Sequence, residues 1–391
     1  MLTEQKKESG SLHLSPQKQT PSSWIEIDKE ALEHNIESYK KIIRPAYLAP
    51  VIKSNAYGHG IGPIAKILDA HIDVDYICVV ALQEALFLRS IGIKKPLLVL
   101  SIIDGDLEDA VDHAIDLITY DIAMAKELDA IARAKNKTAS IHIKIDTGLS
   151  RLGLYNTDAL QLVKEIHELS HVFIQGIFTH LAESESNDQT FTNQQRKVYS
   201  VFVKQVETLG VSIPLKHIAC SAATTANMST NDTMVRLGIG LYGLWPSEEN
   251  KFLAQKLYPN FYLKPVLSWK TRIIQIKEIP AGSAVGYDRT HCVSKPTRIA
   301  IIPVGYWDGY DRRLSNKGIV LINNQKAPII GRIAMNLSIV DITDLSVSKD
   351  HEVTLLGNQK GLTANDLAQQ CNTINYEIVT RINPLLPRRI T

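Results

Sequence analysis

Between residues 24 and 244, short apolar runs alternate with stretches of helical periodicity, and this alternation restricts the fold more than any other feature. The apolar runs are nearly continuous, as is typical of parallel strands whose outer face is covered by helices. We expect eight strands, at 47–53, 76–82, 96–101, 117–121, 140–146, 173–180, 215–221 and 235–243. Eight strand–helix units predict a (β/α)8 TIM barrel.

Helical patterns separate most of these strands, at 83–90, 106–114, 124–135, 158–169 and 194–208. A doubly wound parallel sheet is the competing interpretation of the same alternation. However, no G-x-G-x-x-G motif follows the first strand, and this absence makes a dinucleotide-binding fold less favoured.

Beyond about residue 260, strand patterns continue with few helices between them, at 268–279, 297–305, 319–324, 337–343 and 352–357. We therefore expect a second, mostly β domain with one short helix, 363–371. The early strand 24–28 is compatible with pairing to either domain. The expected organisation is a disordered polar tail over 1–22, a barrel over 23–260 and a C-terminal β domain over 261–391.

Composition excludes several classes of partner. The 391 residues carry a net charge of +2, so nothing calls for nucleic acid or an anionic membrane. No apolar run approaches the ~18 residues of a membrane span. The four cysteines are far apart and form no C-x-x-C pair, so we expect no metal site and a reducing, cytoplasmic location.

Polar residues recur where the expected barrel strands end, which is the side on which barrel enzymes carry their functional groups. Lys53 ends the first strand, in VIKSNAYGHG. A desolvated lysine there would suit covalent chemistry with a carbonyl compound, although position alone favours an ordinary solvated lysine at the end of a strand. The other such residues are Lys144, Asp146, Arg151, His180, Ser221, Arg236, Gly238 and Gly240. Singly, His180 would also suit a core position and Ser221 a helix cap; their collection at one rim favours a site.

The motif around Lys53 resembles the pyridoxal-phosphate lysine motif of alanine racemases, which are fold-type III enzymes. The resemblance continues in order over residues 23–391, through IKIDTGLSRLG, FTHLAESE, SAATTAN, MVRLGIGLYG, AVGYDRTH, PVGYWDGYDRR, GRIAMNLSIVDIT and YEIVTRINPLLPRR. It implies a barrel, a C-terminal β domain, bound pyridoxal 5'-phosphate and a homodimer with shared active sites. It also implies racemisation of L-alanine to D-alanine for peptidoglycan.

The resemblance assigns roles residue by residue. Lys53 would hold the cofactor covalently and act as one catalytic base, and Tyr287, from the other subunit, would act as the second base. The cofactor's phosphate would lie against Tyr57, Ser221, Gly238 and Ile239, and its ring nitrogen would face Arg236, with His180 linking Arg236 to Tyr287. Arg151, Tyr306 and Met335 would bind the substrate, with Arg151 also contacting the cofactor. Lys144 matches a lysine that is often carbamylated in the family.

Two bases on opposite faces of the substrate α-carbon would explain racemisation simply. An arginine at the ring nitrogen leaves that nitrogen unprotonated, because its own pKa exceeds ~12. The cofactor would then be a weak electron sink, which would limit transamination.

Three positions depart from the commonest family pattern: Cys220, Asn336 and Pro384. The last two would widen the substrate pocket, so serine or another small amino acid stays an alternative substrate. A fold-type III decarboxylase is a further alternative, but its usual Cys-Asp pair is missing, because Val293 follows Cys292 and Asn372 follows Cys371. A non-catalytic cofactor carrier would have no need of the β domain.

Overall fold

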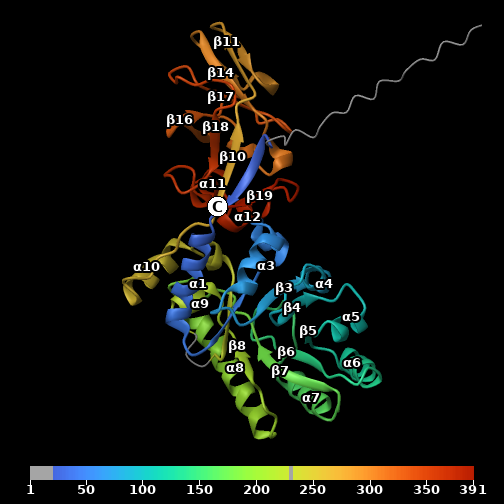
Figure 1. Cartoon of the computed structure of the whole chain (residues 1–391). Helices are drawn as coiled ribbons and strands as arrows, with labels where there is room; N and C mark the ends of the chain where they lie inside the picture. Colours follow the sequence, from blue (N-terminus) through green and yellow to red (C-terminus); the bar gives the residue numbers. More distant parts are fainter. Residues whose placement is uncertain (1–20, 229–231) are drawn as a thin grey trace, which may run out of the picture.

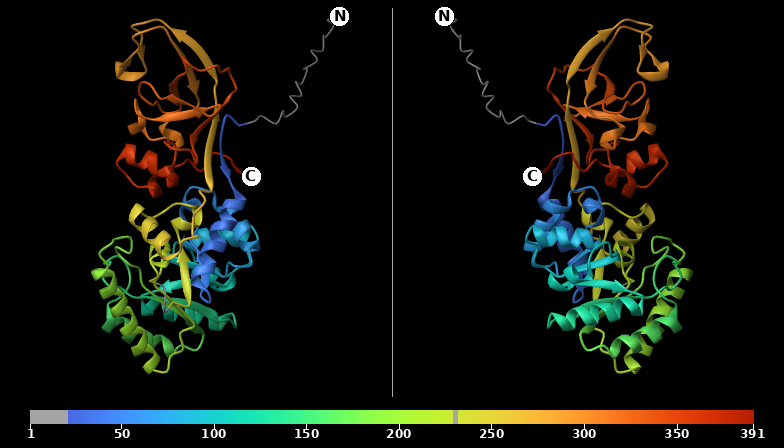
Figure 2. Two further views of the ribbon diagram at one scale, coloured as in Figure 1. Left: turned by 90° about the vertical axis from the view of Figure 1, so that its left-hand side faces the viewer. Right: turned by 90° about the vertical axis from the view of Figure 1, so that its right-hand side faces the viewer.

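The computed structural model describes residues 21–228 and 232–391. Two domains are stacked end to end, with the barrel below and the β domain above in the view of Figure 1. The side views in Figure 2 show the same stacking. The expected disordered tail, apart from residues 21 and 22, lies outside the described residues.

The N-terminal domain contains all eight expected parallel strands. They are β2 (Tyr47–Pro50), β3 (Ile77–Ala81), β4 (Leu97–Ile102), β5 (Ile115–Thr119), β6 (Ala139–Lys144), β7 (Val172–Phe178), β8 (Leu215–His217) and β9 (Met234–Leu237). β3 to β8 form one curled six-stranded sheet, and β2 pairs with β9. Backbone hydrogen bonds from Ile52 to Cys78 (2.8 Å) and from Thr233 to Lys216 (2.9 Å) join the two sheets. The barrel expectation is therefore confirmed.

Helices follow the strands and cover the outside of the sheet (Figure 1). Their amphipathic sequences explain this position; α1, for example, buries Leu32, Ile36 and Tyr39 along one face, and Asp28 caps its first turn. The helices of this domain are α1 (Lys29–Ile43), α2 (Lys53–Tyr57), α3 (Ile61–Ala70), α4 (Leu82–Ser90), α5 (Leu107–Asp112), α6 (Ile122–Ala134), α7 (Asn156–His167), α8 (Thr190–Thr208), α9 (Ser221–Thr225) and α10 (Glu248–Leu257).

The C-terminal domain is mostly β, as expected. One sheet has the order β16-β15-β18-β10-β1-β19 and a second has the order β11-β14-β17, with a small β12-β13 hairpin beside them. The strands are β10 (Leu267–Arg272), β11 (Gln275–Ile279), β12 (Ala284–Val285), β13 (His291–Cys292), β14 (Thr297–Ile302), β15 (Ile319–Ile322), β16 (Gln325–Pro328), β17 (Ser338–Asp341), β18 (Glu352–Leu356) and β19 (Arg388–Ile390). Two helices complete it, α11 (Ala364–Cys371) and α12 (Asn375–Thr380).

The first strand of the chain belongs to the six-stranded sheet of the C-terminal domain. β1 (Ser23–Ile27) pairs antiparallel with β10 and parallel with β19. The expected barrel range began at residue 23, so the structure moves this strand from the barrel to the β domain. The chain therefore forms β1 in the β domain before it builds the barrel.

The expected strand 268–279 is two strands in different sheets. The backbone N–H of Ile273 donates to His351, beside β18, whereas the N–H of Ile274 donates to Ile301 of β14. The chain changes partner between these two residues, and this change carries it from the six-stranded sheet to the three-stranded one.

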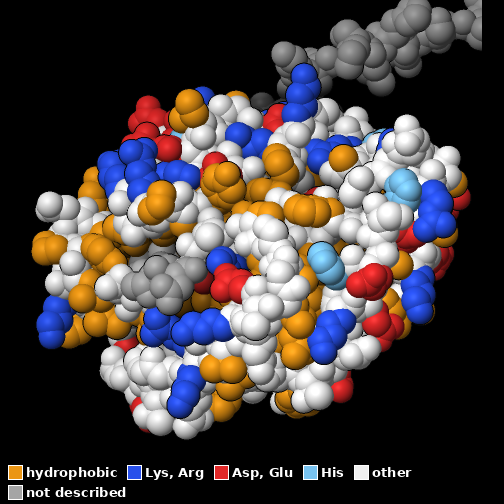
Figure 3. All heavy atoms as spheres, turned by 90° about the horizontal axis from the view of Figure 1, so that it is seen from below, with side chains coloured by type: hydrophobic (Ala, Val, Ile, Leu, Met, Phe, Trp, Pro, Cys, Tyr) orange, Lys and Arg blue, Asp and Glu red, His pale blue; other side chains and the backbone are white. Residues whose placement is uncertain are grey.

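Within the described residues, no helix is both long and apolar enough to cross a bilayer. The lower end of the barrel carries Lys, Arg, Asp and Glu side chains interspersed with apolar ones (Figure 3). This mixed surface agrees with the small net charge of the chain.

Candidate active site

Lys53 lies just after β2, at the first position of α2, a short turn whose backbone is left-handed and not that of a regular α-helix. The next four residues, Ser54 to Tyr57, all have positive φ, between 52° and 55°. Left-handed backbone costs roughly 1–2 kcal/mol for each residue that carries a Cβ. Such strain persists only where the surrounding structure holds it, and it is concentrated at functional positions.

Glu84, near the start of α4, helps to hold this left-handed turn in place. Its Oε1 accepts a hydrogen bond from the backbone N–H of Ser54 at 2.7 Å, and its Oε2 accepts one from Val80 at 2.9 Å. Burial, followed by the charge of Arg151, lowers the pKa of Lys53 below its ordinary value, and Glu84 partly opposes the shift. The lowered pKa increases the fraction of neutral, nucleophilic amine.

One cavity of about 690 Å³ opens at the carboxyl ends of the barrel strands. This volume is within the usual range for small-molecule sites. The cavity brings together nine residues that the sequence predicted for the site: Lys53, Tyr57, Lys144, Arg151, His180, Ser221, Arg236, Gly238 and Ile239.

Ser221, Gly238 and Tyr57 form a compact polar corner of this cavity. The Ser221 hydroxyl oxygen accepts hydrogen bonds from the backbone N–H groups of Gly238 (3.0 Å) and Gly240 (3.2 Å). A Cβ at Gly238 would lie 3.1 Å from the Tyr57 hydroxyl, so glycine keeps this corner open. Burial raises the pKa of Tyr57, so its hydroxyl stays a hydrogen-bond donor at neutral pH.

Arg236 is a buried cation in β9, with 4% of its surface exposed. Its Nη1 donates to Nδ1 of His217 at 2.7 Å, and its Nη2 donates to the Thr179 carbonyl at 2.8 Å. Nη2 also lies 3.4 Å from Nδ1 of His180. Burial and the charge of Arg236 hold the pKa of His180 well below its usual value, so this histidine is neutral.

Lys144 lies at the end of β6 with only 4% of its surface exposed. Burial, followed by the charges of Arg236 and Arg151, lowers its pKa to about 7. Asp146 orders the loop that leads to Arg151, because its Oδ1 accepts hydrogen bonds from the backbone N–H groups of Gly148 (2.8 Å) and Ser150 (3.1 Å).

Three predicted residues of the C-terminal domain, Tyr287, Tyr306 and Met335, do not line this cavity. They lie in the C-terminal domain and expose 68%, 44% and 54% of their surfaces, respectively. A backbone hydrogen bond and an ion pair join their segments. The N–H of Tyr306 donates to Ala334 at 3.0 Å, and Arg332 forms an ion pair with Asp288 at 2.8 Å.

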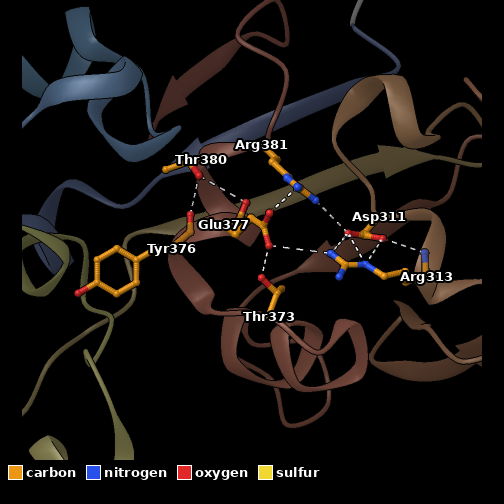
Figure 4. A network of polar contacts seen from close by, with 7 residues as sticks. All are labelled: Asp311, Arg313, Thr373, Tyr376, Glu377, Thr380 and Arg381. Carbon is orange, nitrogen blue, oxygen red and sulfur yellow. Dashed lines mark hydrogen bonds and ion pairs between the residues drawn. The ribbon is translucent and has the colours of Figure 1, made fainter. Parts of the chain in front are cut away.

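Sequence reasoning assigned no role to Glu84 or Tyr376, although Tyr376 also lines the cavity. Tyr376 belongs to α12 and points away from an ion-pair network that joins this helix to the segment around Asp311 (Figure 4). In that network Arg381 pairs with Glu377 and with Asp311 (3.4 Å), and Arg313 pairs with Asp311 at 2.7 Å. The YEIVTR motif was the sequence signal for this residue. Its tyrosine, Tyr376, lines the cavity, and its glutamate, Glu377, forms the ion pair with Arg381.

Of the three departures from the family pattern, Cys220 lines the cavity, with its Sγ 3.4 Å from the Ser184 hydroxyl oxygen. Asn336 and Pro384 are exposed and do not line it. In the described residues, no group of three or more His, Cys, Asp or Glu side chains is arranged to hold a metal ion.

Comparison with known proteins gives a consistent result for both domains. The alanine racemase N-terminal domain matches residues 27–246, and the alanine racemase C-terminal domain matches residues 266–390. The chain is 37% identical to alanine racemase 2 of Caldanaerobacter subterraneus, over 93% of each chain.

Two solved structures have the same fold. Alanine racemase of Clostridium difficile has a TM-score of 0.88 at 31% identity and covers 95% of this chain and 96% of its own. Alanine racemase of Bartonella henselae, with covalently bound pyridoxal phosphate, has a TM-score of 0.81 at 27% identity and covers 95% of this chain and 100% of its own. With its barrel, its β domain and these matches over nearly its whole length, the chain belongs to the alanine racemase family of isomerases.

Proposed function

We propose that this enzyme interconverts L- and D-alanine with pyridoxal phosphate, using Lys53 and Tyr287 as its two bases. The supporting observation is that one cavity contains every residue expected to hold the cofactor. The relative from Bartonella henselae carries pyridoxal phosphate covalently, and its fold is that of this chain. A cytoplasmic location and a supply of D-alanine for peptidoglycan belong to the same proposal.

The residues of the cavity fit the three parts of this cofactor. Ser221, Tyr57 and the amides of Gly238 and Ile239 would hold the phosphate, in the corner that Gly238 keeps open. The Lys53 amine, with its lowered pKa, would hold the aldehyde carbon. Within the described residues, the Arg236 guanidinium donates its hydrogen bonds from Nη1 and Nη2. Its Nε–H would therefore be the donor toward the ring nitrogen.

When bound, pyridoxal phosphate withdraws electrons from the substrate α-carbon and so acidifies its proton. The Lys53 amine would exchange a proton on one face of that carbon. The Tyr287 phenolate would exchange a proton on the opposite face, so the configuration inverts. Arg151, at the cavity wall, would hold the substrate carboxylate.

The position of Tyr287 supports a site that is shared between two subunits. Its side chain is 68% exposed and lies outside the cavity of its own chain. Tyr306, Trp307, Met335 and Leu337, on neighbouring segments, are also at least 43% exposed. Exposed aromatic and apolar side chains of this kind are typical of interfaces, so we propose a homodimer in which Tyr287, Tyr306 and Met335 complete the partner's cavity.

Proton NMR in D₂O with pyridoxal phosphate and L-alanine, followed by chiral chromatography, tests the reaction. We expect the α-proton signal to disappear while D-alanine accumulates, and we expect Lys53→Ala to abolish both changes. Exchange without D-alanine would show one working base and would contradict the role of Tyr287. If alanine is inert, serine is the next substrate to test, because it is another small amino acid.

A further inference from the structure

A line of hydrogen bonds crosses the barrel interior below the candidate site. It begins at Arg236, whose Nη1 lies 2.7 Å from Nδ1 of His217. The Nε2 of His217 lies 2.9 Å from Nδ1 of His142, and the Nε2 of His142 lies 3.4 Å from Oδ2 of Asp116. The four residues come from β9, β8, β6 and β5, and each is at most 9% exposed. Interiors of such barrels are usually filled by branched apolar side chains, so this polar line is unusual.

The chemistry of the groups fixes the direction of every bond in the line. A guanidinium only donates, so Nδ1 of His217 accepts and its ring proton is on Nε2. Nε2 of His217 then donates to Nδ1 of His142, and His142 must donate from Nε2 to the Asp116 carboxylate. Both rings are therefore neutral. Burial and the charge of Arg236 agree with this, because they hold the pKa of His217 well below its usual value.

The far end of the line is also hydrogen-bonded. The Tyr76 hydroxyl donates to Oδ2 of Asp116 at 3.2 Å, and Gln175 donates to the Tyr76 oxygen at 3.2 Å. Oδ2 of Asp116 thus accepts from two donors, Tyr76 and His142. Within the described residues, no carboxylate lies at ion-pair distance from Arg236, so the line connects a buried cation to a buried carboxylate through two neutral rings.

Two further features hold the rings in place. Phe178 stacks on His217, with ring centroids 4.8 Å apart and an interplanar angle of 4°. Gly176 of β7 lies beside the His142 ring, and a Cβ there would overlap Nδ1 of His142. A glycine at this strand position therefore leaves the space in which the two histidines meet.

We propose that Asp116 and His142 are positioning residues that act on Arg236 through His217. The Asp116 carboxylate fixes the tautomer of His142, so that Nδ1 of His142 accepts from Nε2 of His217. His217, held at that end, presents its Nδ1 lone pair to Nη1 of Arg236. Held in this way, Arg236 directs its Nε–H into the cavity. The consequence for catalysis rests on the proposed function, in which Arg236 faces the cofactor's ring nitrogen. The line of hydrogen bonds does not depend on that function.

The histidine tautomers are measurable by long-range proton–nitrogen NMR on ¹⁵N-histidine-labelled protein without cofactor. We expect His142 and His217 of the wild type to be neutral and protonated on Nε2. Asp116→Asn should give a mixture of tautomers in His142, because an amide can donate to its Nε2 as well as accept from it. Asp129→Asn is the matched control, because Asp129 is 4% exposed and lies on α6, outside the line. Nδ1 protonation of His217 in the wild type would overturn the proposal, and so would unchanged tautomers in Asp116→Asn.

A second variant avoids any change of charge. Gly176→Ala should separate the two rings, so that Nε2–H of His217 loses its acceptor while the Asp116 carboxylate stays in place. In the cofactor-loaded enzyme, both variants should lower kcat about tenfold and change KM less. A tenfold loss is the lower end of what is typical when a residue that positions a site residue is removed. Absence of racemisation together with the expected tautomers would refute the proposed function alone. Normal kcat in both variants would refute the positioning role.

Discussion

Oε1 of Glu84 accepts a hydrogen bond from the backbone N–H of Ser54 at 2.7 Å, directly after Lys53. This bond holds the first residue of the left-handed turn. We expect Glu84→Ala to lower the free energy of unfolding by about 1–3 kcal/mol, because two backbone donors lose a charged acceptor. It should also weaken pyridoxal phosphate binding. Urea denaturation and a fluorescence titration with the cofactor measure the two effects.

Glu84→Gln is the matched control for this prediction. Its amide oxygen can still accept from Ser54, but its NH₂ group cannot accept from Val80. The glutamine variant should therefore lie between the wild type and Glu84→Ala in both measurements. An alanine variant with wild-type stability and cofactor affinity would show that the turn keeps its conformation without Glu84.

Complementation between two inactive variants tests whether the sites are shared. In a mixed dimer of Lys53→Ala and Tyr287→Ala chains, one cavity has neither base and the other has both. We expect each variant alone to be inactive and the mixture, after dissociation and reassociation, to recover activity. If Tyr287 acted within its own chain, every site of the mixed dimer would lack a base, and no activity would return.

The periodicity of the sequence was sufficient to predict the barrel and the β domain, because both patterns arise from local burial of side chains. It was insufficient for β1, whose partners β10 and β19 are more than 200 residues away in the chain. The division of 268–279 was missed for the same reason, since Ile273 and Ile274 differ only in their distant hydrogen-bond partners.

The site was predicted unevenly. Residues at strand ends, such as Lys53 and Arg236, stand out because the barrel places strand ends at one rim. The role of Glu84 depends on hydrogen bonds to backbone atoms, which leave no periodic signal. His142 lies in the middle of an apolar strand, where its partner His217 cannot be inferred without the register of the barrel.

Lys144 should make stability depend on pH in a definite direction. Its pKa is about 7 in the folded protein and 10.5 by ordinary value. Between these values the unfolded chain binds a proton that the folded chain lacks, so stability rises with pH and levels off outside this window. In carbonate-free buffer, the free energy of unfolding of the wild type should rise across this window by at least about 1.4 kcal/mol more than that of Lys144→Met, because one pKa unit corresponds to this energy. Equal gains by urea denaturation would contradict the shift.

Bicarbonate should stabilise the same lysine in another way. A neutral Lys144 amine can attack CO₂, forming a C–N bond and releasing one proton to give a carbamate anion. This anion would lie among the charges of Arg151 and Arg236, which lower the pKa of the free amine. We expect bicarbonate to raise the Tm of the wild type but not of Lys144→Met, and intact mass spectrometry under mild conditions to show the added CO₂. An equal rise in both proteins would argue against carbamylation.

Gly58 ends the turn that begins at Lys53, and the chain offers a close control for its substitution. Gly58 has φ +83°, and a Cβ there would overlap the Val379 carbonyl of α12. Gly210 has φ +78°, with no atom within 4 Å of its Cβ position. We expect Gly210→Ala to cost roughly 1–2 kcal/mol from backbone strain alone. Gly58→Ala should cost more and should also weaken cofactor binding, because the turn must move away from α12. Urea denaturation of both variants measures the difference. Equal losses in the free energy of unfolding would mean that α12 moves aside and leaves the turn at Lys53 unchanged.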